Sequence, residues 1–232
     1  GRSLARRFAE HGDTVIVLGR TAARLETVVA ELGKDAVALD CDVSSPDSVR
    51  ATFATIAGKF GNLDILINNA ATYEPFFVAD ATDEQIMGPA LTNFVGPILT
   101  SRAAIPLMRS GAQIVNISSE SVVLDYPMLS LYQSSKAGME RFSESLRKEL
   151  KSAGIRVTVV RAGAMYDEDS TAPAGWNPQA AQTFGELCAR TGIDLRGRPT
   201  SHFKSVAEVV LHVTALPADV GMPIVQLDGF RV

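Results

Sequence analysis

The 232-residue sequence predicts an α/β protein, a doubly wound parallel sheet in three layers with helices on both faces. The main observation is an alternation along the whole chain. Short, almost continuously apolar runs, typical of strands covered on both faces, are followed by amphipathic segments of helical length. The composition agrees, because 46% hydrophobic and 21% charged residues are ordinary for one large globular core.

Six apolar runs are expected to form the strands. They are short and bounded by turn residues, and several are rich in branched aliphatic residues. In chain order they are 14–19, 36–43, 63–70, 112–119, 155–163 and 223–229. No linker separates them, so the sequence predicts a single domain over residues 1–232.

Start and stop signals mark several of the intervening helices. Gly12 stands where a C-cap is expected after the first amphipathic segment. Asn93 lies in a helical stretch between Pro89 and Pro97, where a bend is expected. The N-terminal signals are Ser45 ahead of Pro46 and the capping-box pairs Thr82 with Gln85 and Ser205 with Glu208.

Charge and run length exclude several classes of function. The net charge is −4 and the basic residues are scattered, so no nucleic-acid or anionic-lipid surface is indicated. No apolar run reaches the ~18–20 residues that span a membrane. The cysteines and histidines match no metal spacing, so no metal site is predicted. Two reduced, inert thiols in a cytoplasmic protein are the expected state of Cys41 and Cys188.

The stretch 132–150 carries the strongest chemical signal. Its apolar residues recur at intervals of three and four, which predicts an amphipathic helix. Tyr132 and Lys136 are four residues apart and therefore share a face of it. A nearby ammonium lowers the pKa of a phenol from about 10, which lets a tyrosine exchange a proton with an alcohol or carbonyl. Taken alone, this pair is more often a surface tyrosine with a solvated lysine.

Further polar residues stand where they can join this pair. Ser119 closes a predicted strand thirteen residues before Tyr132, and strand carboxyl ends line the ligand crevice of such sheets. Its hydroxyl is suited to hold a substrate oxygen. Asn93 is unusual inside a helix. The small residues of 68–71 end another strand and let a ligand approach the backbone.

Together these features resemble the short-chain dehydrogenase/reductase family. The motifs that carry the resemblance are Tyr132-x-x-x-Lys136, Ser119, Asn93 and the strand-end Asn-Asn-Ala at 68–70. The set with its spacing is far more specific than any one member, and the similarity covers essentially the whole chain. It implies a Rossmann-like fold and an NAD(P)-dependent oxidoreductase that acts on CH–OH or C=O groups.

The resemblance implies a role for each of four catalytic residues. Tyr132 is the general acid/base, and Lys136 lowers its pKa and holds the nicotinamide ribose. Ser119 orients the substrate carbonyl or alcohol. Asn93 holds a water that relays protons between Lys136 and solvent. The hydride passes to or from the nicotinamide ring, which is the cofactor's own chemistry.

Further positions match the family's cofactor contacts. Asp42 and Val43 resemble the pair at the adenine ring, and Asn69-Ala70-Ala71 the turn at the adenosine ribose. Ala71 replaces a glycine, which could shift the backbone if a positive φ is needed there. The cofactor-binding residues implied are Gly1, Arg20, Asp42, Val43, Asn69, Ala70, Ala71, Tyr132, Lys136 and Gly163.

The cofactor is predicted to be NADP(H), with NAD(H) as the alternative. An acidic residue after the second strand of the fold binds the ribose 2′-hydroxyl and repels a 2′-phosphate. Here Gly19 and Arg20 occupy that position, and a guanidinium suits a phosphate. The alternative to this role is a plain solvent-exposed arginine at position 20.

The chain departs from the family pattern on the nicotinamide side. Ala162 replaces the proline of a Pro-Gly pair, and the chain ends in Leu-Asp-Gly-Phe rather than a double glycine. Asp167 stands about where a threonine usually binds the nicotinamide amide, and Ser170 or Thr171 could substitute for it. These differences leave the catalytic four intact.

Two rival functions are compatible with the same fold. A cofactor-free lyase of the halohydrin dehalogenase kind replaces the lysine with arginine, so Lys136 argues against it. A non-catalytic dinucleotide-binding relative typically loses Tyr132 or Lys136, and both are present. The leading interpretation is an oxidoreductase that interconverts a secondary alcohol and a ketone.

The substrate is expected to be a mostly apolar small carbonyl compound or alcohol. A loop over about 164–202 is expected to cover it, the alternative being a surface insertion with its own small helix. The predicted apolar lining is Phe76, Phe77, Val122, Val123, Leu124, Tyr126, Met128, Met165 and Trp176. The family resemblance further implies a homodimer or homotetramer.

The first residue of the chain matches the last glycine of the family's Thr-Gly-x-x-x-Gly-x-Gly turn. On this interpretation one strand of ~5–6 residues and most of the phosphate-binding turn stand before Gly1 in the full protein. The alternative is a truncated protein, which would expose unpaired strand edges in its core and should barely fold. The first interpretation is favoured.

Overall fold

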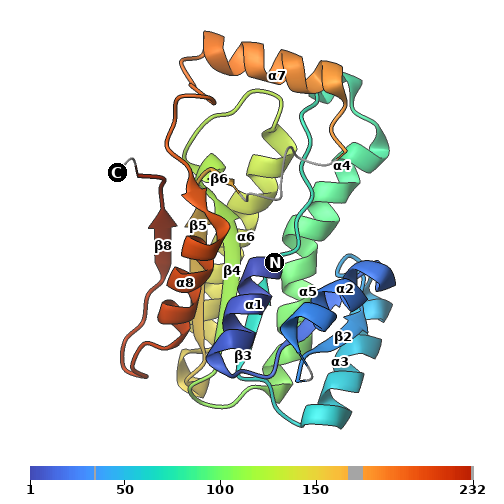
Figure 1. The fold of residues 1–232 in the computed structure, drawn as a ribbon, viewed down its shortest axis with the longest axis vertical. Coiled ribbons are helices and arrows are strands. Elements are labelled where there is room, and N and C mark those ends of the chain that lie inside the picture. Colours follow the sequence, from blue (N-terminus) through green and yellow to red (C-terminus); the bar gives the residue numbers. More distant parts are fainter. Residues whose placement is uncertain (34, 167–174, 231–232) are drawn as a thin grey trace.

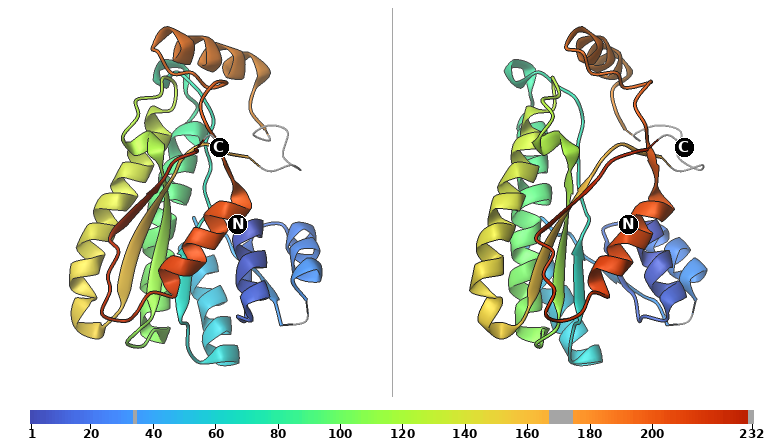
Figure 2. Two further views of the ribbon diagram at one scale, coloured as in Figure 1. Left: turned by 60° about the vertical axis from the view of Figure 1, so that its left-hand side comes forward. Right: turned by 90° about the vertical axis from the view of Figure 1, so that its left-hand side faces the viewer.

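Parallel strands form the middle layer of the molecule, between two layers of helices (Figures 1 and 2). The computed structural model describes residues 1–33, 35–166 and 175–230. All six predicted strands are present, as β1 Ile16–Gly19, β2 Val37–Asp40, β3 Ile65–Asn68, β4 Gln113–Ser119, β5 Arg156–Ala162 and β8 Ile224–Leu227. A short pair, β6 Met165–Tyr166 and β7 Ser201–His202, stands apart from them.

Helices cover both faces, which confirms the predicted three-layer α/β class. One layer holds α3 Pro46–Phe60, α5 Gly96–Ala104 and α6 Ser130–Glu149, and the other holds α1 Arg2–His11, α2 Ala22–Leu32 and α8 Phe203–Thr214 (Figure 2). Two more, α4 Asp83–Pro89 and α7 Pro178–Arg190, lie toward the carboxyl ends of the strands (Figure 1). Short 3₁₀ turns occupy Val78–Asp80, Ile105–Leu107, Glu120–Val122 and Lys151–Ala153.

Hydrogen bonds divide the parallel sheet into two sections. One has the order β3-β4-β5-β8 and the other consists of β1 and β2. A cavity of about 610 Å³ lies between β1 and β3, lined by Ile16 and Leu18 on one side and Ile65 and Ile67 on the other. The edges of β1 and β3 are therefore not paired with each other in the described part of the chain.

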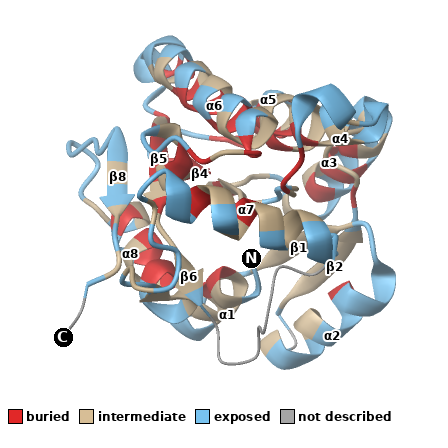
Figure 3. Ribbon diagram, turned by 90° about the horizontal axis from the view of Figure 1, so that it is seen from above, coloured by how far each residue is buried: buried red, intermediate tan, exposed pale blue. Residues whose placement is uncertain are grey.

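The core is densest around β4 and β5. Ile114, Val115 and Val160 are fully buried there, and Figure 3 shows both strands largely in red. In β1 every residue is only partly buried. A parallel sheet has its strands covered on both faces, and β4 and β5 are accordingly almost completely buried although each carries polar residues.

Most of the predicted caps are present, and one is wrong. The Ser45 hydroxyl accepts from the backbone of Ser48, and Thr82 and Gln85 form a reciprocal capping box. Gly12 closes α1 in the left-handed region with φ 100°. Ser205 and Glu208 form no capping box, because α8 begins earlier, with His202 as its N-cap, and Glu208 instead pairs with Arg7.

The predicted bend at Asn93 is a π-helical turn, Ala90–Val95, between α4 and α5. A proline has no N–H to donate to the carbonyl four residues before it. Pro97 therefore cannot give the usual helical hydrogen bond to the Asn93 carbonyl. The widened turn follows from this missing donor, and such π segments often mark functional sites.

Candidate active site

The end of β4 and the first turns of α6 bring three of the predicted catalytic residues together. Ser119 is the last residue of β4, and its side chain lies close enough to that of Tyr132 on α6 to lower the pKa of the phenol. The Lys136 Nζ lies 5.9 Å from the centre of the Tyr132 ring. Residues four apart on a helix share a face, so α6 aligns this pair as their spacing predicts.

Lys136 is almost completely buried, with 3% of its surface exposed. Its ammonium donates a 2.7 Å hydrogen bond to the carbonyl oxygen of Ile117 in β4. Burial lowers the pKa of Lys136 to about 8, and the negative charge of Glu140 opposes that shift. At neutral pH the group is therefore still mostly a cation.

Tyr132 differs from the expectation in its proton affinity. Burial raises the pKa of its hydroxyl, because the phenolate loses solvation. The Ser119 side chain lowers that pKa, while Tyr73 and Glu120 raise it further. The net shift of the Tyr132 pKa is therefore upward and not the predicted lowering by Lys136, because the effect of burial is the largest. Tyr132 thus keeps its proton at neutral pH and can donate it.

Asn93 ties the loop after β3 to α6. Its Oδ1 accepts from the Thr72 backbone N–H at 2.8 Å, and its Nδ2 donates to the Thr72 carbonyl at 2.8 Å and to the Ser135 hydroxyl at 3.1 Å. Both amide protons are thus engaged in holding these segments together next to Lys136. The water relay expected at Asn93 stays a prediction.

The predicted cofactor-binding residues follow the ends of β1, β2 and β3. A Cβ placed on Gly1 would come within 3.0 Å of the Asn69 amide nitrogen, so glycine lets the start of α1 approach Asn69. Arg20 directly follows β1 and lies near Asp42. Hydrogen bonds from Ser44, at 2.6 and 2.9 Å, are the main cause that lowers the pKa of Asp42, and the Arg20 charge adds to it.

Four further positions predicted to bind the cofactor have backbones that suit their residues. Val43 and Ala70 line the 610 Å³ cavity together with Gly1. Ala71 has no positive φ, so the alanine at the family's glycine position introduces no strain. A Cβ on Gly163 would lie 2.7 Å from the carbonyl oxygen of Leu227, so this position needs glycine.

A row of aromatic rings leads from Tyr132 into the 164–202 segment. Tyr73 lies 5.2 Å from Tyr132, Trp176 lies 5.4 Å from Tyr73, and Phe184 lies 5.7 Å from Trp176, all between ring centres. The indole N–H of Trp176 donates to the Tyr73 carbonyl at 2.9 Å. Phe184 belongs to α7, so the predicted substrate segment does contain a helix, and that helix packs toward the site.

The predicted apolar lining is only partly buried. Phe76, Tyr126 and Met128 are buried, whereas Phe77, Val123 and Leu124 are exposed. Tyr73 was not singled out by sequence, although it directly follows the small residues at the end of β3. The residues proposed for the nicotinamide amide, Asp167, Ser170 and Thr171, lie outside the described residues.

A charged cluster that the sequence did not indicate lies one residue beyond Ser119. The Arg198 guanidinium bonds both the Glu120 carboxylate and the Tyr126 hydroxyl, and Tyr126 donates to Glu120 at 3.0 Å. Burial, followed by the Glu120 charge, raises the pKa of Tyr126 to about 12. The cluster fastens the segment before α8 to the end of β4. Glu120 beside Ser119 was the one signal available for it.

Other kinds of site are not indicated in the residues that the structure describes. Within 1–33, 35–166 and 175–230, no three His, Cys, Asp or Glu side chains gather as metal ligands would. None of the helices seen there combines the length and apolar character needed to cross a membrane. Cys41 and Cys188 are free and buried, and burial raises the pKa of both thiols, so both are poorly reactive.

Comparison with known proteins agrees with this geometry. The family model described as short chain dehydrogenase matches residues 1–174. The NADP-dependent 3-hydroxy acid dehydrogenase YdfG of Salmonella typhi is 30% identical over 234 residues, covering 98% of this chain and 89% of that protein. Serine 3-dehydrogenase of Agrobacterium fabrum is 33% identical over 190 residues, covering 79% and 75%.

Solved structures show the same arrangement of elements. A short chain dehydrogenase from Burkholderia cenocepacia in complex with NADP is 28% identical, covers 99% of this chain and 91% of that one, and superposes with a TM-score of 0.81. Serine dehydrogenase from Escherichia coli is 26% identical, covers 98% and 91%, and has a TM-score of 0.76. The chain therefore belongs to the short-chain dehydrogenase family of oxidoreductases.

Proposed function

We propose that this protein is an NADP(H)-dependent oxidoreductase that interconverts a secondary alcohol and a ketone, with Tyr132 as its general acid/base. The observation that carries the proposal is that Ser119, at the end of β4, lies beside the Tyr132 side chain while the buried Lys136 ammonium lies 5.9 Å from the centre of that ring. A proton donor, an oxygen-binding hydroxyl and a fixed cation thus meet at one strand end.

Tyr132 is poised to donate its proton. Its raised pKa keeps the hydroxyl protonated, so in the reducing direction it gives a proton to the carbonyl oxygen of the substrate. Ser119 holds that oxygen through its own hydroxyl. Lys136 stabilises the phenolate that remains, since its ammonium is anchored by Ile117 beside the ring. When bound, the dinucleotide supplies the hydride.

The residues at the ends of β1 and β3 suit an NADP molecule. Gly1 and Asn69 leave backbone accessible at the start of α1, where a helix N-terminus favours a phosphate. Arg20 follows β1 where an NAD-binding site would carry a carboxylate. Its guanidinium is the expected partner of the 2′-phosphate. Relatives whose names or complexes include NADP support this choice over NAD.

A small, mostly neutral carbonyl compound is the proposed substrate class. The rings of Tyr73 and Trp176 and the buried Met128 give the substrate side an apolar character. Arg198 lies near this side, but Glu120 balances its charge. The names of two relatives make 3-hydroxy acids and serine the first alternatives to test.

The two rival functions fit less well. A cofactor-free lyase would not need a buried lysine beside the tyrosine, and a non-catalytic binder would not need the Ser119 contact. A homodimer or homotetramer in the cytoplasm completes the proposal, on the family resemblance. Light scattering after size exclusion tests the assembly.

The deciding experiment combines binding with turnover. NADPH fluorescence on mixing reports binding, and NADPH oxidation with a panel of neutral ketones, 3-oxo acids and 2-amino-3-oxo acids reports activity. We expect binding together with turnover of at least one neutral ketone. Binding without any turnover would favour the non-catalytic reading, and neither binding nor turnover would refute the dehydrogenase assignment. Turnover of the acids alone would replace the substrate class but keep the mechanism.

A further inference from the structure

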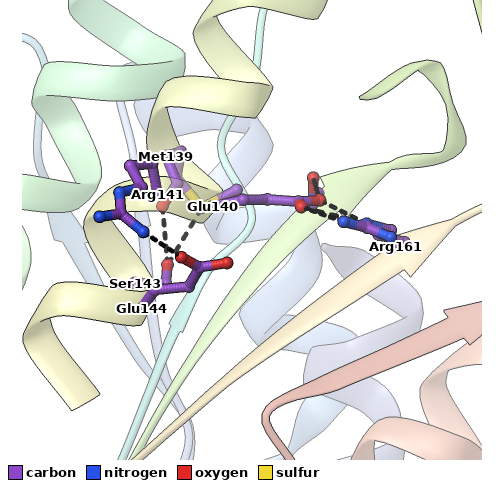
Figure 4. Close-up of polar contacts among 7 residues, drawn as sticks. Met139, Glu140, Arg141, Ser143, Glu144 and Arg161 are labelled. Atoms are coloured by element: carbon purple, nitrogen blue, oxygen red, sulfur yellow. Dashed lines mark hydrogen bonds and ion pairs between the residues drawn. The ribbon is translucent and has the colours of Figure 1, made fainter. Parts of the chain in front are cut away.

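Glu140 is a buried carboxylate that the proposed mechanism does not use. It lies on α6 one turn after Lys136 and is 5% exposed. Its Oε1 accepts from the Ser118 hydroxyl at 2.6 Å and from Arg161 Nε at 2.9 Å, and its Oε2 accepts from Arg161 Nη2 at 2.6 Å. Figure 4 shows the Arg161 guanidinium facing the Glu140 carboxylate, to which its Nε and Nη2 donate.

The partners of Glu140 come from two neighbouring strands. Ser118 on β4 and Arg161 on β5 are directly paired in the parallel register, so both reach the same carboxylate from the sheet. Three consecutive residues of β4 then approach α6: the Ile117 carbonyl accepts from Lys136, the Ser118 hydroxyl donates to Glu140, and Ser119 lies beside Tyr132. Glu140 is thus part of the same row of contacts that places the candidate catalytic groups.

Glu140 also supplies a negative charge near the Lys136 ammonium. Its charge opposes the effect of burial on Lys136. The other titratable groups around Lys136 are Tyr132 on its own helix, Arg161 of β5, which reaches it only through Glu140, and Glu120, which acts on Tyr132. Glu140 is therefore the anion among them that acts directly on Lys136.

We propose that Glu140, held by Arg161 and Ser118, is a positioning residue that fixes α6 against the ends of β4 and β5 and keeps Lys136 charged. This proposal rests on the proposed function, because that function makes Lys136 part of the catalytic machinery. A buried pair of this kind is costly to form and so needs a role beyond general stability.

The test uses two substitutions that should shift the pH at which Lys136 loses its proton in opposite directions. E140Q keeps the shape of the side chain but removes its charge and leaves Arg161 unpaired, so Lys136 should lose its proton at lower pH. The alkaline limb of the kcat/KM profile should move to lower pH, giving about tenfold less activity near pH 9 and little change near pH 7. R161Q removes the positive charge that balances the Glu140 carboxylate, so the alkaline limb of the profile should move to higher pH. The double variant E140Q/R161Q should return close to the original profile.

A matched control is available on the same helix. Arg141 and Glu144 form an exposed ion pair of 2.7 Å on the outer face of α6, also visible in Figure 4. E144Q removes an equal charge and should leave the profile unchanged. Melting temperatures of all variants separate folding from positioning. If E140Q is too unstable to assay, the double variant against R161Q alone still measures the effect of the Glu140 charge.

A readout without turnover keeps the two proposals separate. The Lys136 side chain can be titrated by NMR on protein with ¹³C-labelled lysine, assigned with K136R. Its midpoint is expected at about 8, lower in E140Q and higher in R161Q. An unchanged midpoint in both variants would overturn the Glu140 proposal even if the enzyme is active. Shifted midpoints in a protein that turns over no substrate would instead refute the proposed function.

Discussion

The β4–β5–α6 region, the tight region, and the β1–β2–α2 region, the looser region, differ in how deeply their residues are buried. In the first, β4 has seven residues, pairs on both sides and contains Ile114 and Val115 with no exposed surface. In the second, β1 has four residues, all of them only partly buried, and Leu25 is the buried residue of α2. Figure 3 shows the contrast between the red strands and the mostly pale α2.

Because of this difference, the proton-transfer residues and the cofactor-binding residues stand on parts of the fold that are packed differently. Ser119, Tyr132 and Lys136 stand on the tight region, so the fold itself sets the geometry for proton transfer. Gly1 and Arg20 stand at the ends of elements of the looser region. We therefore expect proton-transfer variants to act on turnover alone, and variants around β1 to act on cofactor binding and on stability by smaller amounts.

The largest expected effect is that of Y132F. Removing the hydroxyl deletes the proton donor and should lower kcat about 10³-fold. The ring remains and the tight region around it does not depend on the hydroxyl, so the Kd for NADPH should change less than about threefold. Stopped-flow kinetics and fluorescence titration measure the two quantities. Y73F, which removes a hydroxyl from the neighbouring ring, is the control and should keep most of the turnover.

The next prediction compares the two regions directly through their stability. I114A removes a fully buried side chain from β4 and should cost about 2–5 kcal/mol of unfolding free energy. I16A makes the same truncation in β1, where the side chain is only partly buried, and should cost less, about 1–2 kcal/mol. Urea unfolding of both variants tests this. Equal losses would contradict the difference in tightness.

Arg20 provides a smaller test, confined to the looser region. R20A should raise the KM for NADPH about 10- to 100-fold and leave the KM for NADH unchanged, because a charged hydrogen bond to the 2′-phosphate contributes about 1.5–3 kcal/mol. Turnover at saturating cofactor should stay near the original value. Steady-state kinetics with both cofactors decides. An enzyme that prefers NADH before and after the substitution would show that Arg20 is only a surface residue.

Sequence could predict the tight region well because its signals are local. Six strands follow from apolar runs, and the Tyr132–Lys136 pair from a spacing of four on one helix. Glu140 could have been noticed by the same spacing from Lys136. Arg161 carries another usable signal, since a charged residue inside an otherwise apolar strand needs a partner. Their pairing depends on the register that sets Ser118 beside Arg161, which no local pattern specifies.

Sequence failed where long-range contacts override local preference. Ser205 and Glu208 fit a capping box, but Arg7 from α1 takes the Glu208 carboxylate. The expected lowering of the Tyr132 pKa by Lys136 failed because spacing gives no measure of burial.

The last comparison uses two glycines, one inside α3 and one directly after β5. A Cβ on Gly58 in α3 would meet nothing within 4 Å, so G58A should stabilise the protein by about 0.5–1 kcal/mol through helix propensity. The same methyl on Gly163 would lie 2.7 Å from the Leu227 carbonyl and should destabilise by about 1–3 kcal/mol. Opposite shifts in melting temperature are expected. A neutral G163A would mean that β8 moves aside easily, and the tight region would then end at β5.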